Sequence, residues 1–287
     1  MGTARKLAIA AVAAGVLVPP LRRRLRLPAP VVSVLAWQAP YALTLALPRT
    51  RARDAGVYAL QMWAYFAHYQ MPADDPDNLL ERLKVRYPIR ADEWMGRGEA
   101  PTIRLQKRIG SSDSVRPHDF ALAAVHWAWF FYPHATVAYT LWKRPEQFPR
   151  AATLMAGTFD AGLLVYWLVP TAPPWWAAAN ADMPPVRRIM TEVGEQVWGR
   201  AWAPMFAYIG GNPFAAMPSL HFGTSVTAAH ILSRIGRKQG AVGWAYAGTL
   251  GFALVYLGEH YVVDLLAGLG LAEGVRAGAR LLHLDPP

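Results

Sequence analysis

The chain contains no cysteine among its 287 residues. Disulfide bonds, thiolate nucleophiles and cysteine-ligated zinc are therefore excluded. Charge is also scarce, because only 17% of the residues are charged, whereas an ordinary soluble domain has roughly 25%. The sequence shows no internal repeat and no low-complexity tract. These absences make both a disulfide-bonded scaffold and a typical soluble domain poor descriptions of the chain.

Apolar side chains are abundant instead. Hydrophobic residues make up 54% of the chain, and 12 Trp, 12 Tyr and 10 Phe are among the aromatic and apolar residues. One soluble core of this length does not need so many, whereas a bilayer as solvent does. The formal net charge is +10, and its basic clusters lie between apolar runs, which is the positive-inside pattern. No nucleic-acid-binding motif accompanies them, so we expect a membrane and no nucleic acid as partner.

The apolar stretches set the expected fold. A spanning helix needs about 20 residues, and candidates occur at 7–20, 30–47, 55–71, 120–142, 151–170, 221–236, 242–258 and 261–278. We predict an all-α integral membrane protein with a core of about six helices and one or two additional N-terminal helices. The first stretch has a basic start but no small-residue cleavage site, so we interpret it as a retained helix. The expected domains are membrane helices at 1–71, an extracytoplasmic polar segment at 72–118 and a membrane core at 119–287.

Basic turns predict the orientation of these helices. Turns with Lys or Arg at 143–150 and 234–238 should face the cytoplasm. The loop at 171–220 and the turn at 258–261 then share the extracytoplasmic side with the 72–118 segment. The arginine cluster at 22–26 conflicts with this scheme if both flanking helices span the membrane. The alternative is that one of them lies in the interface.

The sequence Gly-Glu-His-Tyr-Val-Val-Asp at 258–264 carries the first chemical signal. His260 and Asp264 are four residues apart, so they share one face of a helix. A carboxylate there can accept a hydrogen bond from one ring nitrogen. This bond selects the tautomer and leaves the other nitrogen free to attack an electrophile.

The sequence Met-Pro-Ser-Leu-His at 217–221 carries the second signal, at the expected start of another helix. Helix N-termini favour anions because their N–H groups are free and the helix dipole is positive there. Ser219 can donate to a phosphate oxygen, and His221 can protonate a leaving oxygen as a general acid. The two motifs together predict phosphoryl transfer that requires no metal ion and no other cofactor.

These motifs, together with Pro-Thr-Ala-Pro-Pro-Trp at 170–175, resemble the type 2 phosphatidic acid phosphatase superfamily. The nearer similarity is to the branch that contains fungal inositol phosphorylceramide synthase. The resemblance covers roughly residues 120–278. It implies that His260 forms a phosphohistidine, that Asp264 orients it, that His221 is the acid and that Ser219 binds the phosphoryl group.

The chain departs from the superfamily pattern in its cations. Where the phosphatases carry an arginine six residues before the nucleophile, this chain has Leu254. Lys143 and Arg150 have the spacing of the first phosphatase motif but lie on the expected cytoplasmic side. The remaining phosphate-binding candidates lie in the outer segments: Arg187, Arg188, Arg104, Lys107 and Arg108.

Further residues are candidates for shaping the site, namely Pro173, Pro174, Trp175, His126 and Tyr261. The proline-tryptophan run could equally end a helix and anchor it at the membrane interface. His126 and His134, with Asp160 on the next helix, are ionisable residues within expected spans. We interpret them mainly as a buried histidine–aspartate hydrogen bond that locks two helices, with His126 nearer the outer face.

The sequence therefore predicts a multi-pass cell-membrane enzyme with an extracytoplasmic active site. It would move a polar-headgroup phosphate, with inositol phosphate as one candidate, from a phospholipid to a lipid alcohol. One alternative is a phosphatase that uses water and acts on phosphatidate or a polyprenyl diphosphate. Another is a proton-coupled transporter, although the strongest motifs lie at helix ends. The acceptor and the oligomeric state are not determined by the sequence.

Overall fold

The computed structural model describes residues 2–282, and in that range the regular elements are helices, with two isolated bridges and no β-strand. The expected all-α fold is confirmed. The α-helices are α1 (Thr3–Leu25), α2 (Ala29–Ala46), α3 (Arg51–Gln70), α4 (Pro76–Glu81), α5 (Arg86–Met95), α6 (Pro101–Ile109), α7 (Pro117–Ala128), α8 (Tyr132–Lys143), α9 (Phe148–Leu168), α10 (Pro174–Ala179), α11 (Ile189–Trp198), α12 (Trp202–Gly210), α13 (Leu220–Ile235), α14 (Arg237–Tyr256) and α15 (Val262–Leu281). Short 3-10 turns are η1 (Met71–Asp74), η2 (Pro145–Gln147) and η3 (Gly199–Ala201).

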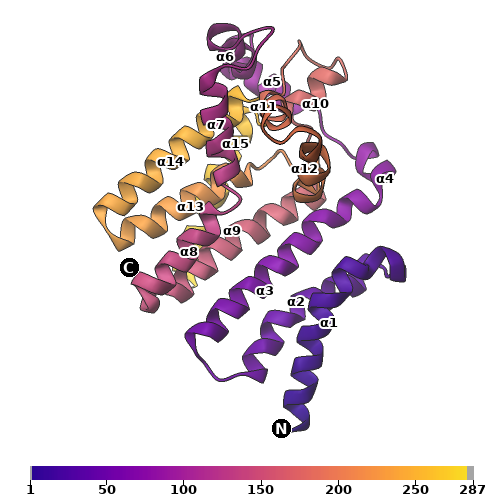
Figure 1. Ribbon diagram of the computed structural model, residues 1–287, viewed down its shortest axis with the longest axis vertical. Coiled ribbons are helices and arrows are strands. Elements are labelled where there is room, and N and C mark those ends of the chain that lie inside the picture. The colour runs from indigo at the N-terminus through magenta and orange to yellow at the C-terminus, as the bar shows by residue number, and fades with distance from the viewer. Residues whose placement is uncertain (1, 283–287) are drawn as a thin grey trace.

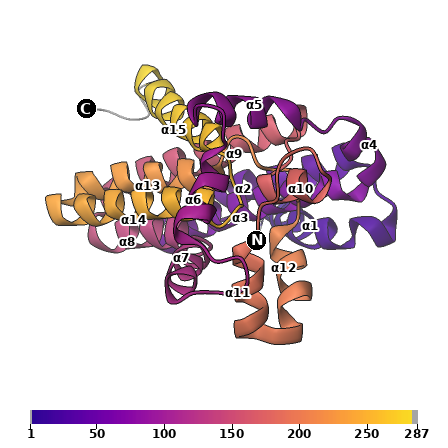
Figure 2. The same ribbon diagram turned by 90° about the horizontal axis from the view of Figure 1, so that it is seen from above.

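Long apolar helices form the body of the molecule. Three segments of the described chain, Thr3–Leu25, Ala29–Ala46 and Pro145–Leu168, are long and apolar enough to cross a membrane. These apolar helices indicate a membrane protein, in agreement with the composition. Figure 1 shows the short helices α5, α6, α10 and α11 at one end of the bundle, and Figure 2 shows α11 and α12 projecting side by side from it.

One expected helix, 120–142, is broken into α7 and α8 by the turn at 129–131. Pro133, at the second position of α8, lacks an N–H group, and its ring collides with the carbonyl one turn earlier in a continuous helix. Trp129 lies in the break and donates its indole N–H to Oγ1 of Thr224 on α13, at 2.8 Å. The Trp129 side chain in the break therefore contacts α13 near its start, where one of the two motifs lies.

The 72–118 segment folds into α4, α5 and α6 and covers the end of the bundle where both motifs lie. The arginine cluster that ends α1 contacts this segment at Asp74. Arg22 and Arg23 both contact the carboxylate of Asp74, at 2.6 and 2.5 Å. The cluster that conflicts with the positive-inside pattern thus has an acidic partner in the 72–118 segment.

Candidate active site

Two glycines allow α13 and α15 to touch along their backbones. A Cβ atom on Gly268 of α15 would lie 2.4 Å from the carbonyl oxygen of Ser219, and one on Gly223 of α13 would lie 2.8 Å from that of Gly268. Only glycine permits so close an approach. The N–H of Ser219 donates to the carbonyl of Asp264 at 2.9 Å. The start of α13 therefore lies against the first turns of α15, and His221 on α13 faces His260, which lies just before α15.

His260, Asp264 and His221 form a connected set. Nδ1 of His260 lies 3.2 Å from Oδ2 of Asp264, and its Nε2 lies 3.2 Å from Nδ1 of His221. Asp264 is fully buried, and the same Oδ2 accepts the backbone N–H of Tyr261 at 2.9 Å. The carboxylate is thus held by its own helix terminus. Each ring nitrogen of His260 has a different partner. The expected bond between His260 and Asp264 is present, although His260 lies two residues before the start of α15 and not on its face.

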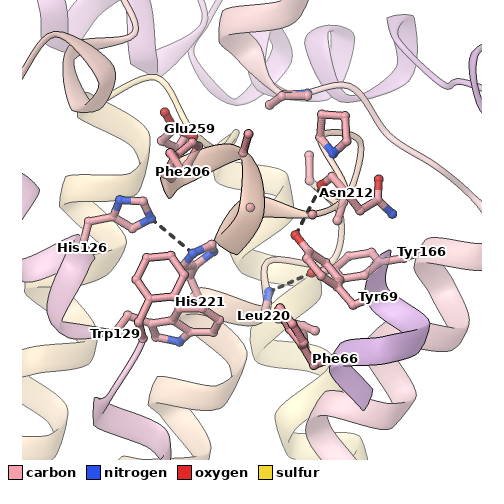
Figure 3. A pocket seen from close by; sticks show the side chains of 18 of the residues that line it. Phe66, Tyr69, His126, Trp129, Tyr166, Phe206, Asn212, Leu220, His221 and Glu259 are labelled. Carbon is pink, nitrogen blue, oxygen red and sulfur yellow. Dashed lines mark hydrogen bonds between the residues drawn. The ribbon is translucent and has the colours of Figure 1, made fainter. Parts of the chain in front are cut away.

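A third histidine extends this set. Nε2 of His126, on α7, lies 3.2 Å from Nε2 of His221, as Figure 3 shows. The His126 side chain is buried, and its Nδ1 has no hydrogen-bond partner among residues 2–282. The Trp129 ring lies 4.0 Å from the His221 ring, centroid to centroid. His126 and Trp129 therefore enclose the side of His221 that faces away from His260.

These histidines open into a cavity of about 850 Å³. Its polar wall carries His126, His221, His260, Arg188 and Glu259. Aromatic side chains from α3, α9 and the α7–α8 break line a second wall, visible in part in Figure 3: Tyr65, Phe66, Tyr69, Trp129, Phe159 and Tyr166. The cavity can therefore take a ligand with one polar and one apolar part.

Arg188 is the sole lysine or arginine among the described residues that line this cavity. Its Nε donates to Oε1 of Glu259 at 3.0 Å, and its guanidinium carbon lies 3.8 Å from the centre of the Trp175 ring. The neighbouring carboxylate and the aromatic face hold the guanidinium beside His260, which follows Glu259 in the chain. Of the five cations considered from the sequence, the structure brings Arg188 to the histidines.

The other four cations lie outside the cavity lining. Arg187 binds the carboxylate of Glu192 and the carbonyl of Ser111. Arg104 donates to the carbonyl of Gly96, and Lys107 contacts Glu99 at 2.5 Å. Arg108 lines a separate depression with Arg116 and His118.

The remaining candidates divide between the cavity and its surroundings. Pro173 and Trp175 line the cavity, whereas Pro174 and Tyr261 are buried outside its lining. Ser219 is also fully buried outside the lining, and its Oγ accepts the N–H of Phe222 at 3.3 Å as the N-cap of α13. In this arrangement Ser219 starts the helix that carries His221.

The expected histidine–aspartate lock between the helices does not form. Asp160 instead accepts a hydrogen bond from Gln61 at 2.8 Å, and His134 pairs with the Tyr58 hydroxyl at 3.1 Å. Both partners lie on α3, so the polar pairs attach α3 to α8 and α9. Sequence reasoning missed this because 76 and 99 residues separate the partners.

Sequence reasoning also missed Asp92. This residue of α5 is fully buried, and its two carboxylate oxygens accept the N–H groups of Val262 and Val263 at 2.9 and 3.0 Å. An aspartate in a polar outer segment gives no signal of such a role, since 170 residues separate it from Val262.

Long apolar helices, with His221, His260 and Asp264 beside a half-apolar cavity, characterise the class of helical membrane proteins to which the chain belongs. The family model described as the PAP2 superfamily matches residues 113–276, which is more than half of the chain and includes both motifs. The chain therefore belongs to the PAP2 superfamily, whose members are generally phosphatases or phosphotransferases. No curated protein and no solved structure matches the chain. The resemblance found in the sequence is confirmed at the level of the superfamily.

Proposed function

We propose that this protein is a lipid phosphotransferase that moves a polar-headgroup phosphate from a phospholipid to a lipid alcohol through a phosphohistidine. Inositol phosphate is one candidate for the transferred group. The observation that carries the proposal is the pairing of His260 with Asp264 at Nδ1 and with His221 at Nε2, both at 3.2 Å, beside the cavity.

In the first step Nε2 of His260 attacks the phosphorus of the donor lipid. The bond between phosphorus and the leaving oxygen breaks, and protonated His221 gives its Nδ1 proton to that oxygen. Asp264 accepts the Nδ1–H of His260 and stabilises the positive charge that develops on the ring. The products are a neutral His221, a lipid alcohol and a phosphohistidine that carries the headgroup.

In the second step the acceptor alcohol attacks the same phosphorus. His221 takes the proton of the attacking hydroxyl at Nδ1, and the bond between phosphorus and Nε2 of His260 breaks. The proton borrowed in the first step is thereby returned. The cycle consumes no proton and needs no cofactor.

The charge of the cavity favours a phosphodiester over a phosphomonoester. Arg188 is the single lysine or arginine among the described lining residues, and Glu259 at 3.0 Å already balances its charge; Glu195 lines the cavity as well. A dianionic monoester or a diphosphate needs more neighbouring positive charge than a monoanionic diester does. This arrangement supports headgroup transfer over hydrolysis of phosphatidate or a polyprenyl diphosphate.

The aromatic wall supports a lipid as the substrate. Tyr65, Phe66 and Phe159 give an acyl chain an apolar surface that continues from the histidines into the helical bundle. We place the site at the extracytoplasmic face of a multi-pass cell-membrane protein, on the charge pattern of the turns. In that orientation the headgroup lies at the membrane surface and the chain points inward.

Mass spectrometry of the lipid products tests the proposal, with purified protein in bilayers of mixed phospholipids and lipid alcohols. We expect a new phosphodiester lipid with the wild type and none with His260→Ala. His230→Ala is the matched control, because His230 also pairs with a carboxylate, that of Glu273 at 2.6 Å, but does not line the cavity. Free phosphate and dephosphorylated lipid alone would identify a phosphatase. Proton flux that depends on His260, without any lipid product, would identify a transporter.

A further inference from the structure

Helix α15, which begins two residues after His260, receives an N-terminal cap from a distant part of the chain. The first N–H groups of a helix have no partner within it, and the N-cap residue Tyr261 provides no side-chain hydrogen bond. Asp92 satisfies two of these N–H groups: its Oδ2 accepts the N–H of Val262 at 2.9 Å and its Oδ1 accepts that of Val263 at 3.0 Å. Bonds between a carboxylate and helix N–H groups are charge-assisted and strong.

Asp92 is itself held in place by the outer segment. Just before α5, the N–H of Lys84 donates to the carbonyl of Pro170 at 2.8 Å, and the carbonyl of Lys84 accepts the N–H of Ala172 at 3.0 Å. The hydroxyl of Tyr87 on α5 contacts Oγ1 of Thr171 at 2.8 Å. The 72–118 segment is therefore attached to the proline-rich run at 170–175, beside the cavity. Asp92, further along the same segment, contacts the start of α15.

We propose that Asp92 is a positioning residue that keeps His260 and Asp264 in register with His221. His260 lies two residues before Val262, and Asp264 lies one residue after Val263, so the bonds from Asp92 hold the turn that carries both. The proposal rests on the proposed phosphotransfer at His260. It also gives a function to an outer segment that lies largely outside residues 113–276.

The isosteric substitution Asp92→Asn tests the proposal. The asparagine oxygen can accept one of the two N–H groups, but its NH2 group must then face the other. A misplacement of about 1 Å in a reacting group can lower turnover by about 10²-fold. We expect kcat to fall at least about tenfold with KM within about twofold of wild type, because cavity residues such as Arg188 that bind substrate are untouched.

Asp75→Asn is the matched control. Asp75 also lies in the outer segment and caps a helix, since its Oδ1 accepts the N–H of Asn78 at 3.2 Å. It caps α4 and does not contact α15, so we expect kcat and KM of this variant to equal those of the wild type. A folded Asp92→Asn variant with wild-type kcat would overturn the proposal.

A second variant separates positioning from a general loss of stability. Val262→Pro removes one N–H donor at the first position of α15, where proline is compatible with a helix, and the extended backbone of Tyr261 suits a following proline. Alone it should also lower kcat. In the double variant Asp92→Asn, Val262→Pro, residue 262 has no N–H group for the asparagine NH2 to oppose. The combined loss of kcat, expressed as a free energy, should therefore be smaller than the sum of the two separate losses. Additive losses would contradict a shared action of Asp92 and Val262.

Hydrogen exchange of residues 261–264 provides a readout that does not depend on activity. The amides of Val262 and Val263 should exchange at least about tenfold faster in Asp92→Asn than in the wild type or Asp75→Asn, because the cap that protects them is lost. Unchanged exchange would refute the capping role even if no substrate were turned over. Absence of any lipid product from the wild type would instead contradict the proposed function.

Discussion

Replacing His126 tests whether the third histidine acts through the general acid. His126→Leu removes the hydrogen bond at 3.2 Å to Nε2 of His221 and keeps a buried side chain of similar size. When His221 is protonated, its Nε2–H needs an acceptor, and Nε2 of His126 is in place to be one. A hydrogen bond to a charged group contributes about 1.5–3 kcal/mol, and about 1.36 kcal/mol corresponds to tenfold in rate. We therefore expect kcat to fall roughly 10- to 150-fold.

The assay is single-turnover formation of the acid-labile phosphohistidine at His260, with two donor lipids. One carries the natural alkyl leaving group, and the other a nitrophenol, which departs without protonation. If His126 acts through His221, the loss should be large with the first donor and small with the second. His126→Gln should recover part of the rate, because its amide oxygen can accept the Nε2–H of His221. Equal losses with both leaving groups, or wild-type rates in His126→Leu, would refute this reasoning.

Four other predictions follow from the same geometry. Asp264→Asn should lower kcat by about 10⁴-fold, as loss of the orienting carboxylate does in a catalytic triad. The measurement is the rate at which the phosphohistidine forms in the burst phase. Arg188→Ala should raise KM for a phosphodiester lipid, whereas Arg187→Ala should not, in steady-state kinetics with both variants. Turnover should survive EDTA, and its loss on chelation with recovery on adding a divalent cation would contradict a metal-independent mechanism. Burial raises the pKa of Asp92 to about 6, above the unfolded value. Its contribution to stability is therefore fully present below the unfolded pKa and is lost as the pH rises to the folded value of about 6. Between pH 4 and 6 the wild-type melting temperature should thus fall more than that of Asp92→Asn.

The local parts of the site could be predicted from the sequence because they depend on spacing within a short stretch of chain. The pairing of His260 with Asp264 was predicted from their separation of four residues, and the structure contains it, but the expected shared helix face was wrong, because α15 begins at Val262 and His260 lies just before it. The charge pattern of the turns also predicted that His221 and His260 lie at one end of the bundle. In the structure, Nδ1 of His221 lies 3.2 Å from Nε2 of His260. The break between α7 and α8 was missed, although Pro133 marks it, because the apolar pattern continues through it.

Composition, hydropathy and two short motifs determined by themselves that this is an apolar helical protein with a histidine–aspartate pair, and they identified its superfamily. Tertiary structure decided which distant groups join that pair. His126 reaches His221 across 95 residues, Arg188 reaches Glu259 across 71, and Asp92 reaches Val262 across 170. No periodicity relates such positions, because their distance depends on how whole helices pack. The close contact of α13 and α15 at Gly223 and Gly268, which brings His221 beside His260, exists only once those helices pack together.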